Sequence, residues 1–292
     1  MKRTWLLGAR CRPGPLDNLA NLGDAPGVGS SYPGGKNGAG VFQTIINGMP
    51  PHGVYLEPFL GGGAVMRLKR PARLNIGLDL DPDVVRSFGC WPVGTLPAPS
   101  AVFGDASSRR PPSPVPARGS GHAGFGEGAP RFKFFRGDAF DFLRGYSFTG
   151  TELVYCDPPY MHETRGRADL YRYELRDWQH RDLLKIIKRL PCAVMISGYW
   201  TALYAEYLKK WRLTTFNTTN RAGALTTECV WSNFPEPVAL HDYRYLGDGF
   251  RERERIKRKK NRWVRRLERI DGLERRALLA AIAEAWRVEL AV

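Results

Sequence analysis

The tetrapeptide Asp157-Pro158-Pro159-Tyr160 places a carboxylate, a rigid backbone and an aromatic ring directly after the apolar run 153–156. Proline fixes φ and donates no backbone hydrogen bond, so the two prolines hold the Asp157 carboxylate and the Pro158 carbonyl as a pair of acceptors. Two acceptors suit an NH2 group, and the Tyr160 ring can stack on the flat heterocycle that carries this amine. The alternative is a strand that ends in an ordinary Pro-Pro turn.

A glycine-rich segment lies upstream, at residues 54–66, where a short apolar strand runs into Gly61, Gly62 and Gly63 and then into an expected helix. Glycines allow backbone N–H groups to approach a ligand closely. The spacing is not the GxGxxG of a nicotinamide site. Further along the chain a second expected strand ends at Asp79, where an open α/β sheet places a carboxylate that binds a ribose.

With these motifs in this order, the chain resembles the adenine-specific DNA methyltransferases of the DNA adenine methylase family, in particular their prokaryotic and phage members. The resemblance covers roughly residues 31–83 and 132–250. It rests on an ordered set of segments: Tyr32–Lys36, Glu57–Gly63, Asp157–Tyr160, His162–Arg165, Tyr171–Glu174, Ile196–Tyr199 and Thr227–Asn233.

The resemblance implies a Rossmann-like α/β fold, S-adenosylmethionine as the cofactor, and methyl transfer to the N6 amine of adenine in double-stranded DNA after base flipping. It also implies the residues of the site. The catalytic set is Asp157, Pro158, Pro159 and Tyr160. The cofactor set is Tyr32, Lys36, Glu57, Pro58, Phe59, Gly61, Gly62, Gly63, Asp79 and Asp138.

Within the cofactor set, the resemblance places Tyr32 against the adenine ring, Lys36 near the methionine carboxylate and Asp79 on the ribose hydroxyls. Phe59 and the glycines shape the loop, and Asp138 contacts the adenine edge. Each position has an ordinary alternative. Tyr32 and Phe59 could be core residues, Lys36 could be a surface charge, and Asp138 could be a helix cap.

The expected chemistry follows from the delocalised lone pair of adenine N6, which makes this nitrogen a poor nucleophile. Hydrogen bonds to Asp157 and to the Pro158 carbonyl would localise and orient that lone pair for in-line attack on the methyl group. The proton then leaves to Asp157 or to water. A sulfonium leaving group needs no metal, and His162 and His180 have no neighbours at metal-ligand spacing in the sequence.

Charge and composition agree with a nucleic-acid enzyme. The 292 residues include 44 Lys and Arg against 29 Asp and Glu, a net charge of +15 that points to a polyanionic partner. No segment approaches the eighteen or more consecutive apolar residues of a membrane span. The five cysteines are odd in number and widely spaced, so we expect a reducing cytoplasm, near the nucleoid or in the host of a phage.

The segment from Arg251 to Arg269 holds eleven basic and three acidic residues, with apolar residues at helical spacing. The alternatives are a solvated helix docked through its apolar stripe and a helix that contacts nucleic-acid phosphates; the motifs favour the second, with salt-sensitive binding. The candidate DNA-contacting residues, some from the loop after residue 160, are Arg165, Arg167, Arg172, Arg258, Lys259, Lys260 and Arg262.

The chain divides into a flexible arm at 1–30, a methyltransferase domain at 31–250 and a basic helical extension at 251–292. Within the domain, residues 91–130 contain eight Pro and seven Gly, which predicts an extended or disordered insertion without regular structure. Many family members carry a target-recognition domain here. The short insertion therefore suggests weak sequence specificity, or recognition by the loop at 161–176 and the basic helix.

The sequence predicts a doubly wound sheet whose strands lie near 54–57, 74–79, 132–136, 152–156, 193–197, 212–217 and 228–234. Asp177 is the expected N-cap of an amphipathic helix, and a last helix is expected at 273–290 after an Asp271-Gly272 turn. Two other functions stay open. One is methylation of RNA or of another planar amine, and the other is nucleic-acid binding without catalysis.

Overall fold

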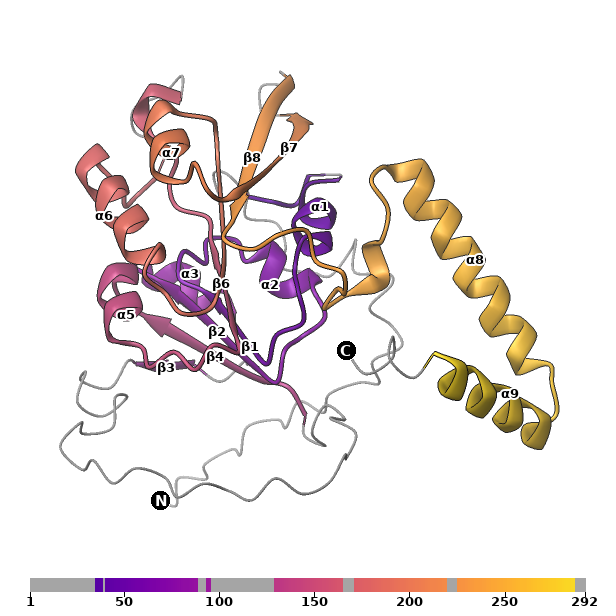
Figure 1. Cartoon of the computed structure of the whole chain (residues 1–292). Helices are drawn as coiled ribbons and strands as arrows, with labels where there is room; N and C mark the ends of the chain where they lie inside the picture. Colours follow the sequence, from indigo (N-terminus) through magenta and orange to yellow (C-terminus); the bar gives the residue numbers. More distant parts are fainter. Residues whose placement is uncertain are drawn as a thin grey trace, which may run out of the picture. The chain divides into compact units, whose positions relative to one another are not determined.

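The computed structural model describes residues 35–38, 40–88, 93–95, 129–164, 171–219 and 225–286 (Figure 1). These residues belong to the unit that spans 32–292. The expected arm at 1–30 lies outside them, as do most of the Pro/Gly-rich insertion and the loop residues 165–170. Among the described residues, no helix has both the length and the apolar character needed to cross a membrane.

An eight-stranded sheet forms the centre of the fold, in the order β3-β4-β2-β1-β5-β6-β8-β7. All neighbouring strands are parallel except for β8, which is antiparallel to both β6 and β7. The strands are β1 (Val54–Glu57), β2 (Leu74–Asp79), β3 (Val93–Thr95), β4 (Arg131–Arg136), β5 (Glu152–Cys156), β6 (Ala193–Gly198), β7 (Arg212–Thr219) and β8 (Leu225–Ser232).

The order of the strands reverses between β1 and β5, because β2 and β4 extend to one side and β6 to the other. In open α/β sheets this switch point is where connecting loops diverge and leave a crevice at the carboxyl ends of the strands. The expected doubly wound, Rossmann-like sheet is confirmed. Glu57 ends β1 and Asp157 follows β5, so the first catalytic residue predicted from the sequence lies at the crevice.

Helices cover both faces of the sheet (Figure 1). These helices are α1 (Val41–Asn47), α2 (Ala64–Leu68), α3 (Pro82–Arg86), α5 (Ala139–Gly145), α6 (Asp177–Ile187) and α7 (Ala202–Tyr207). Helices α8 (Phe250–Glu268) and α9 (Gly272–Ala285) do not cover the sheet, and none of their residues is buried. Strand residues alternate between two cores: Val154 and Cys156 pack with α5, α6 and α7, whereas Leu153 and Tyr155 pack with α1, α2 and α3. This period of two explains the apolar run Leu153–Cys156 of β5, which is buried on both faces.

Four sequence-based expectations need correction. The insertion contributes a strand, because Val93–Thr95 pairs with β4 and extends the sheet by one edge strand. The last strand is Leu225–Ser232 rather than 228–234, since it pairs along its length with β7. The last helix, α9, spans Gly272–Ala285 rather than the expected 273–290. The N-cap of α6 is Arg176, whose backbone N–H donates to the Gln179 side chain, and Asp177 is the first helical residue.

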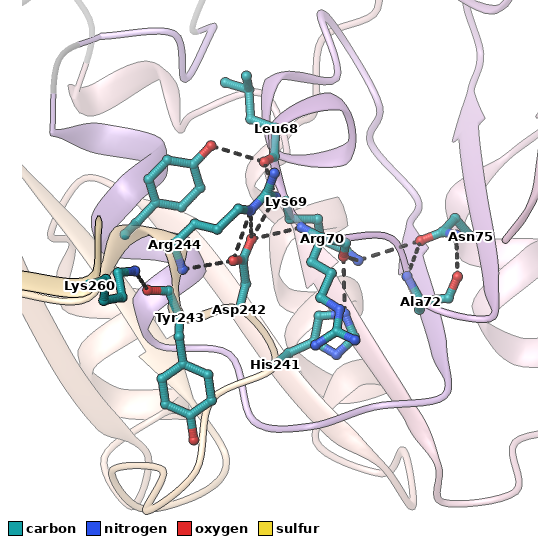
Figure 2. A network of polar contacts seen from close by, with 11 residues as sticks. Leu68, Lys69, Arg70, Ala72, Asn75, His241, Asp242, Tyr243, Arg244 and Lys260 are labelled. Carbon is teal, nitrogen blue, oxygen red and sulfur yellow. Dashed lines mark hydrogen bonds and ion pairs between the residues drawn. The ribbon is translucent and has the colours of Figure 1, made fainter. Parts of the chain in front are cut away.

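A polar network around the buried Asp242 connects the segment after β8 to the turn between α2 and β2 (Figure 2). The Asp242 carboxylate, 1% exposed, accepts from the Arg70 backbone N–H at 2.8 Å and from the Arg244 guanidinium at 2.7 Å. Arg244 also donates to the Leu68 carbonyl at 2.8 Å. The Lys260 ammonium of α8 donates to the Tyr243 carbonyl at 2.8 Å, which attaches α8 to this network.

Candidate active site

The Asp157 carboxylate is oriented by groups on two other elements. Its Oδ1 accepts a hydrogen bond from Ser197 Oγ at 2.8 Å, and Ser197 comes from the neighbouring strand β6. The same oxygen lies 2.8 Å from Lys36 Nζ, in the segment that precedes α1. Among the described residues, none is hydrogen-bonded to Asp157 Oδ2. One oxygen is therefore held by the protein while the other remains available to an amine.

Lys36 is a buried cation, 4% exposed, so the alternative of a surface charge is wrong. Its Nζ donates to the Tyr160 hydroxyl at 2.7 Å and lies 3.7 Å from Glu228 Oε2. Burial opposes the charged form of Lys36, but the Asp157 and Glu228 carboxylates outweigh it, and the pKa of the ammonium lies above its ordinary value. Lys36 is therefore charged at neutral pH.

Tyr160 lies in a buried network in this structure. Its hydroxyl donates to Glu228 Oε2 at 2.9 Å, and its ring meets the Tyr199 ring edge-on at a centroid distance of 4.8 Å. The ring is 6% exposed and does not line the cavity described below. Stacking of Tyr160 on a flipped base therefore stays a prediction.

Ser197 and Glu228 were missed as site residues, although both lie in segments that carry the family resemblance. Ser197 follows the apolar run of β6, and Glu228 directly precedes the apolar residues Cys229–Trp231 of β8. Both are buried, at 0% and 7% exposure. A buried polar residue in a central strand needs a partner, and this signal could have identified them from the sequence.

A cavity of about 330 Å³ opens at the switch point between β1 and β5. Its wall contains residues of four predicted motifs: Tyr32–Lys36, Glu57–Gly63, Asp157–Tyr160 and Tyr171–Glu174. The predicted site residues that line it are Lys36, Glu57, Pro58, Phe59, Gly61, Gly62, Gly63, Asp79, Asp138, Asp157, Pro159 and Arg172. Pro158 is buried and Tyr32 lies outside the described residues. The fold thus gathers most of the expected cofactor set around one space.

The glycine loop is held in place by Asp79. Its Oδ2 accepts from the Gly61 N–H at 2.8 Å and its Oδ1 from the Asp81 N–H at 2.9 Å. Burial raises the pKa of Asp79 above its ordinary value despite these two hydrogen bonds. Gly61 and Gly63 have φ values of 48° and 59°, in the left-handed region that favours glycine. Asp79 therefore has a structural role in shaping the loop, whatever it binds in the cavity.

Glu57 is a strongly perturbed carboxyl group of the cavity wall. Its Oε2 accepts from the Tyr55 hydroxyl at 3.0 Å. Burial raises the pKa of Glu57 to about 8, the Tyr55 hydrogen bond lowers it, and the negative charge of Asp157 raises it further. Burial and the neighbouring Asp157 charge thus favour the protonated form of Glu57 at neutral pH.

Asp138 and Phe59 serve the fold as well as the cavity. Asp138 Oδ1 accepts from the backbone N–H groups of Phe140 and Asp141 and caps α5, so the helix-cap alternative is correct. Phe59 packs against one of the two cores and meets Phe140 edge-on. Both residues also line the cavity. A contact between Asp138 and a cofactor remains a prediction.

The loop after β5 contributes to the cavity where it is described. Tyr171, Arg172, Tyr173 and Glu174 all line it. Arg172 lies 3.2 Å from Asp81 and 3.0 Å from Asp83, so in this structure the expected DNA-contacting residue forms ion pairs beside the cofactor loop. Arg165 and Arg167 lie outside the described residues.

Helix α8 carries a stripe of arginines along one side, which we call the arginine ridge. At 100° per residue its members fall on a single face, and all are exposed. They are Arg251, Arg255, Arg258, Arg262, Arg265, Arg266 and Arg269. Of the four α8 residues predicted to contact DNA, Arg258 and Arg262 lie on the ridge and Lys259 lies beside it. Lys260 is on the other side, bonded to Tyr243.

The apolar residues of α8 do not dock it as a buried stripe. Trp263 and Val264 are 56% and 53% exposed, and no residue of α8 is buried. The alternative of a helix docked through its apolar face therefore does not fit this structure. Among the described residues, no group of three or more His, Cys, Asp or Glu side chains could hold a metal ion.

The sequence matches no protein-family model and no curated protein. Solved structures with a similar fold include an rRNA methylase from Streptococcus thermophilus, with 10% identity, a TM-score of 0.35, and coverage of 68% of this chain and 95% of that one. A dimethyladenosine transferase from Plasmodium falciparum has 12% identity, a TM-score of 0.36, and coverage of 66% and 60%. Neither likeness assigns a substrate to this chain.

Proposed function

We propose that this protein transfers a methyl group from S-adenosylmethionine to the N6 amine of adenine in nucleic acid, with double-stranded DNA as the favoured substrate. One observation carries the proposal. The Asp157 carboxylate lies at the carboxyl end of β5 in the wall of a 330 Å³ cavity, with Oδ1 held by Ser197 and Lys36. Its other oxygen can accept a hydrogen bond from an amine.

The cavity suits S-adenosylmethionine. Its volume lies within the range of small-molecule sites, and it sits where doubly wound sheets bind nucleotides. Backbone of the Gly61–Gly63 loop and the carboxyl groups of Glu57, Asp79 and Asp138 line it, which suits a ligand with a ribose, an adenine and positive charge. The bound cofactor supplies an activated methyl on a sulfonium that leaves as a neutral thioether.

Asp157 and the Pro158 carbonyl perform the orienting step on the substrate. Each accepts one N–H of the adenine amine and directs the nitrogen lone pair toward the methyl carbon. The N6–C bond would form as the methyl–sulfur bond breaks, and the electron pair of the broken bond would remain on sulfur. The N6 proton passes to Asp157 or to water. Ser197 holds the carboxylate in its orientation throughout, since it donates to Oδ1.

Nucleic acid as the substrate is supported by charge. The chain carries a net charge of +15, and the arginine ridge presents seven exposed guanidinium groups on one side of α8. Such a ridge suits phosphates and reads no base sequence by itself. The motif resemblance to DNA adenine methylases favours duplex DNA, from which the target base must be extruded. RNA is the alternative substrate.

The proposal is tested by incubating the protein with labelled S-adenosylmethionine and unmethylated duplex DNA or RNA of matched sequence, followed by nucleoside analysis. We expect labelled N6-methyl-2′-deoxyadenosine from the DNA. If the label is found only in the RNA, we would conclude that RNA, and not DNA, is the substrate. Tight binding of either polymer without transfer would support the non-catalytic alternative and overturn the proposal.

A further inference from the structure

Lys36 and Asp157 form a buried pair of one hydrogen-bond donor and one acceptor at the cavity wall. Lys36 Nζ and Asp157 Oδ1 are 2.8 Å apart, and their side chains are 4% and 18% exposed. Both residues line the cavity. The pair therefore presents a positive donor and a negative acceptor, side by side, to any flat molecule that enters.

Both members of the pair are fixed by further contacts. Ser197 donates to Asp157 Oδ1, and Tyr160 accepts from Lys36 Nζ at 2.7 Å while it donates to Glu228 at 2.9 Å. Glu228 Oε2 lies 3.7 Å from Lys36 Nζ, so the ammonium has a second carboxylate nearby. Lys36 can therefore remain charged and in place when a substrate amine engages Asp157.

The order of donor and acceptor fits adenine, whose N6 amine donates beside an accepting ring nitrogen on two edges: N1 on the Watson–Crick edge and N7 on the major-groove edge. Enzymes that extrude a base read its Watson–Crick edge by hydrogen bonds, which favours N1 over N7. We propose that Lys36 is a specificity-determining residue that donates to N1 of the target adenine while Asp157 accepts from N6. This inference rests on the proposed function.

The pairing has consequences for other bases. Guanine carries an N1–H donor next to the O6 acceptor, the reverse order, so the positions that correspond to adenine N1 and N6 place no amine against Asp157. Cytosine has the same order as adenine, with N4 as donor and N3 as acceptor. The Lys36–Asp157 pair thus selects an amine next to an unprotonated ring nitrogen, and the size of the ring must be read by other groups.

Glu228 is a positioning residue in this arrangement, because it acts through Lys36 and Tyr160. Glu228→Ala removes the acceptor of the Tyr160 hydroxyl and the second carboxylate of Lys36, so discrimination between bases with and without N1 should fall. Glu228→Gln retains an acceptor oxygen and should keep most of the discrimination between these bases. A merely structural role would lower the melting temperature without changing the ratio of affinities for the two bases.

The decisive probe is 1-deazaadenine, which has C–H in place of N1 and keeps the amine. One duplex is prepared with adenine, 1-deazaadenine or purine opposite an abasic site, and binding is measured by fluorescence anisotropy with S-adenosylhomocysteine present. Wild-type protein should prefer adenine over 1-deazaadenine by about 10- to 100-fold, as expected for one hydrogen bond from a charged donor. Lys36→Met should bind the two alike, while both proteins should disfavour purine, which lacks the amine.

The controls separate the possible failures. Lys185→Met, an exposed lysine of α6, should behave as wild type. If Lys36→Met keeps the preference for adenine but loses affinity for S-adenosylhomocysteine, Lys36 serves the cofactor and the inference is overturned. Methyl transfer to adenine without discrimination against 1-deazaadenine would overturn the inference alone. Discrimination without any methyl transfer would overturn the proposed function alone.

Discussion

Two carboxyl groups of the cavity wall, the buried Glu57 on β1 and the partly exposed Asp157 after β5, lie in different electrostatic settings. Asp157 has the Lys36 ammonium at 2.8 Å and the Ser197 hydroxyl at 2.8 Å. Glu57 accepts from the Tyr55 hydroxyl at 3.0 Å, while its burial and the negative charge of Asp157 oppose its ionisation. One carboxylate is thereby paired with a cation while its neighbour is driven toward the neutral form.

This difference predicts how Glu57 affects stability with pH. Burial and the charge of Asp157 raise the pKa of Glu57 from 4.5 to about 8, so the folded state keeps a proton that the unfolded state loses between these values. Wild-type stability should therefore fall relative to Glu57→Gln as pH rises from 5 to 8, by on the order of 4 kcal/mol. Urea unfolding of both proteins at each pH measures the difference. A constant difference would show that Glu57 is ionised in the folded protein.

At the scale of elements, the strand-to-helix turn after β1 depends on Gly63. This residue has a φ of 59°, and a Cβ atom there would collide with the Phe88 ring. Gly63→Ala should lower the free energy of unfolding by about 2–3 kcal/mol, from backbone strain and overpacking. Gly272→Ala is the matched control, because an added Cβ meets nothing within 4 Å and the residue begins α9. Equal stability of the two variants in denaturant melts would contradict this account.

The elements also show what the sequence could predict. Strands such as β1, β2 and β5 lie within one residue of their expected bounds, because short apolar runs between turn residues admit few alternatives. The edge strand β3 was missed since its three residues lie among prolines and glycines, and only pairing with β4 identifies it. The local sequence pattern of these three residues does not reveal that they pair with a strand far along the chain.

The site was predictable in its membership and less so in its contacts. The glycine loop, Asp79 and Asp157 follow strand ends, and parallel strands bring their carboxyl ends together. The pairing of Lys36 with Asp157 and Glu228 joins residues far apart in the chain. Lysine is rarely buried, so composition alone favours a surface position. Only the folded chain shows that Lys36 is buried and pairs with the Asp157 carboxylate.

At the scale of the whole molecule, the arginine ridge should govern binding to nucleic acid. Replacing Arg258, Arg262, Arg265 and Arg269 together by Gln should reduce the slope of log K against log salt by about 0.9 for each duplex-DNA phosphate that the protein no longer neutralises. A control replaces four other exposed basic residues at or just after α6: Arg181, Lys185, Lys188 and Arg189. The two quadruple variants are compared by measuring binding from low to moderate salt. Equal slopes for both variants would mean that the net charge of the protein, and not the arginine ridge, determines binding.

The central claim is that Asp157 orients the amine that receives the methyl group. Its most direct test is single-turnover methyl transfer to adenine by wild type, Asp157→Ala and the surface control Asp141→Ala, each saturated with labelled S-adenosylmethionine. We predict that Asp157→Ala binds the cofactor and keeps the wild-type fold, although its stability is lower because the buried Lys36 loses one counter-charge. Its rate should be at least about 100-fold lower, because a key orienting and stabilising group is absent. The Asp141→Ala rate should be unchanged. Transfer by Asp157→Ala at the wild-type rate would contradict the claim.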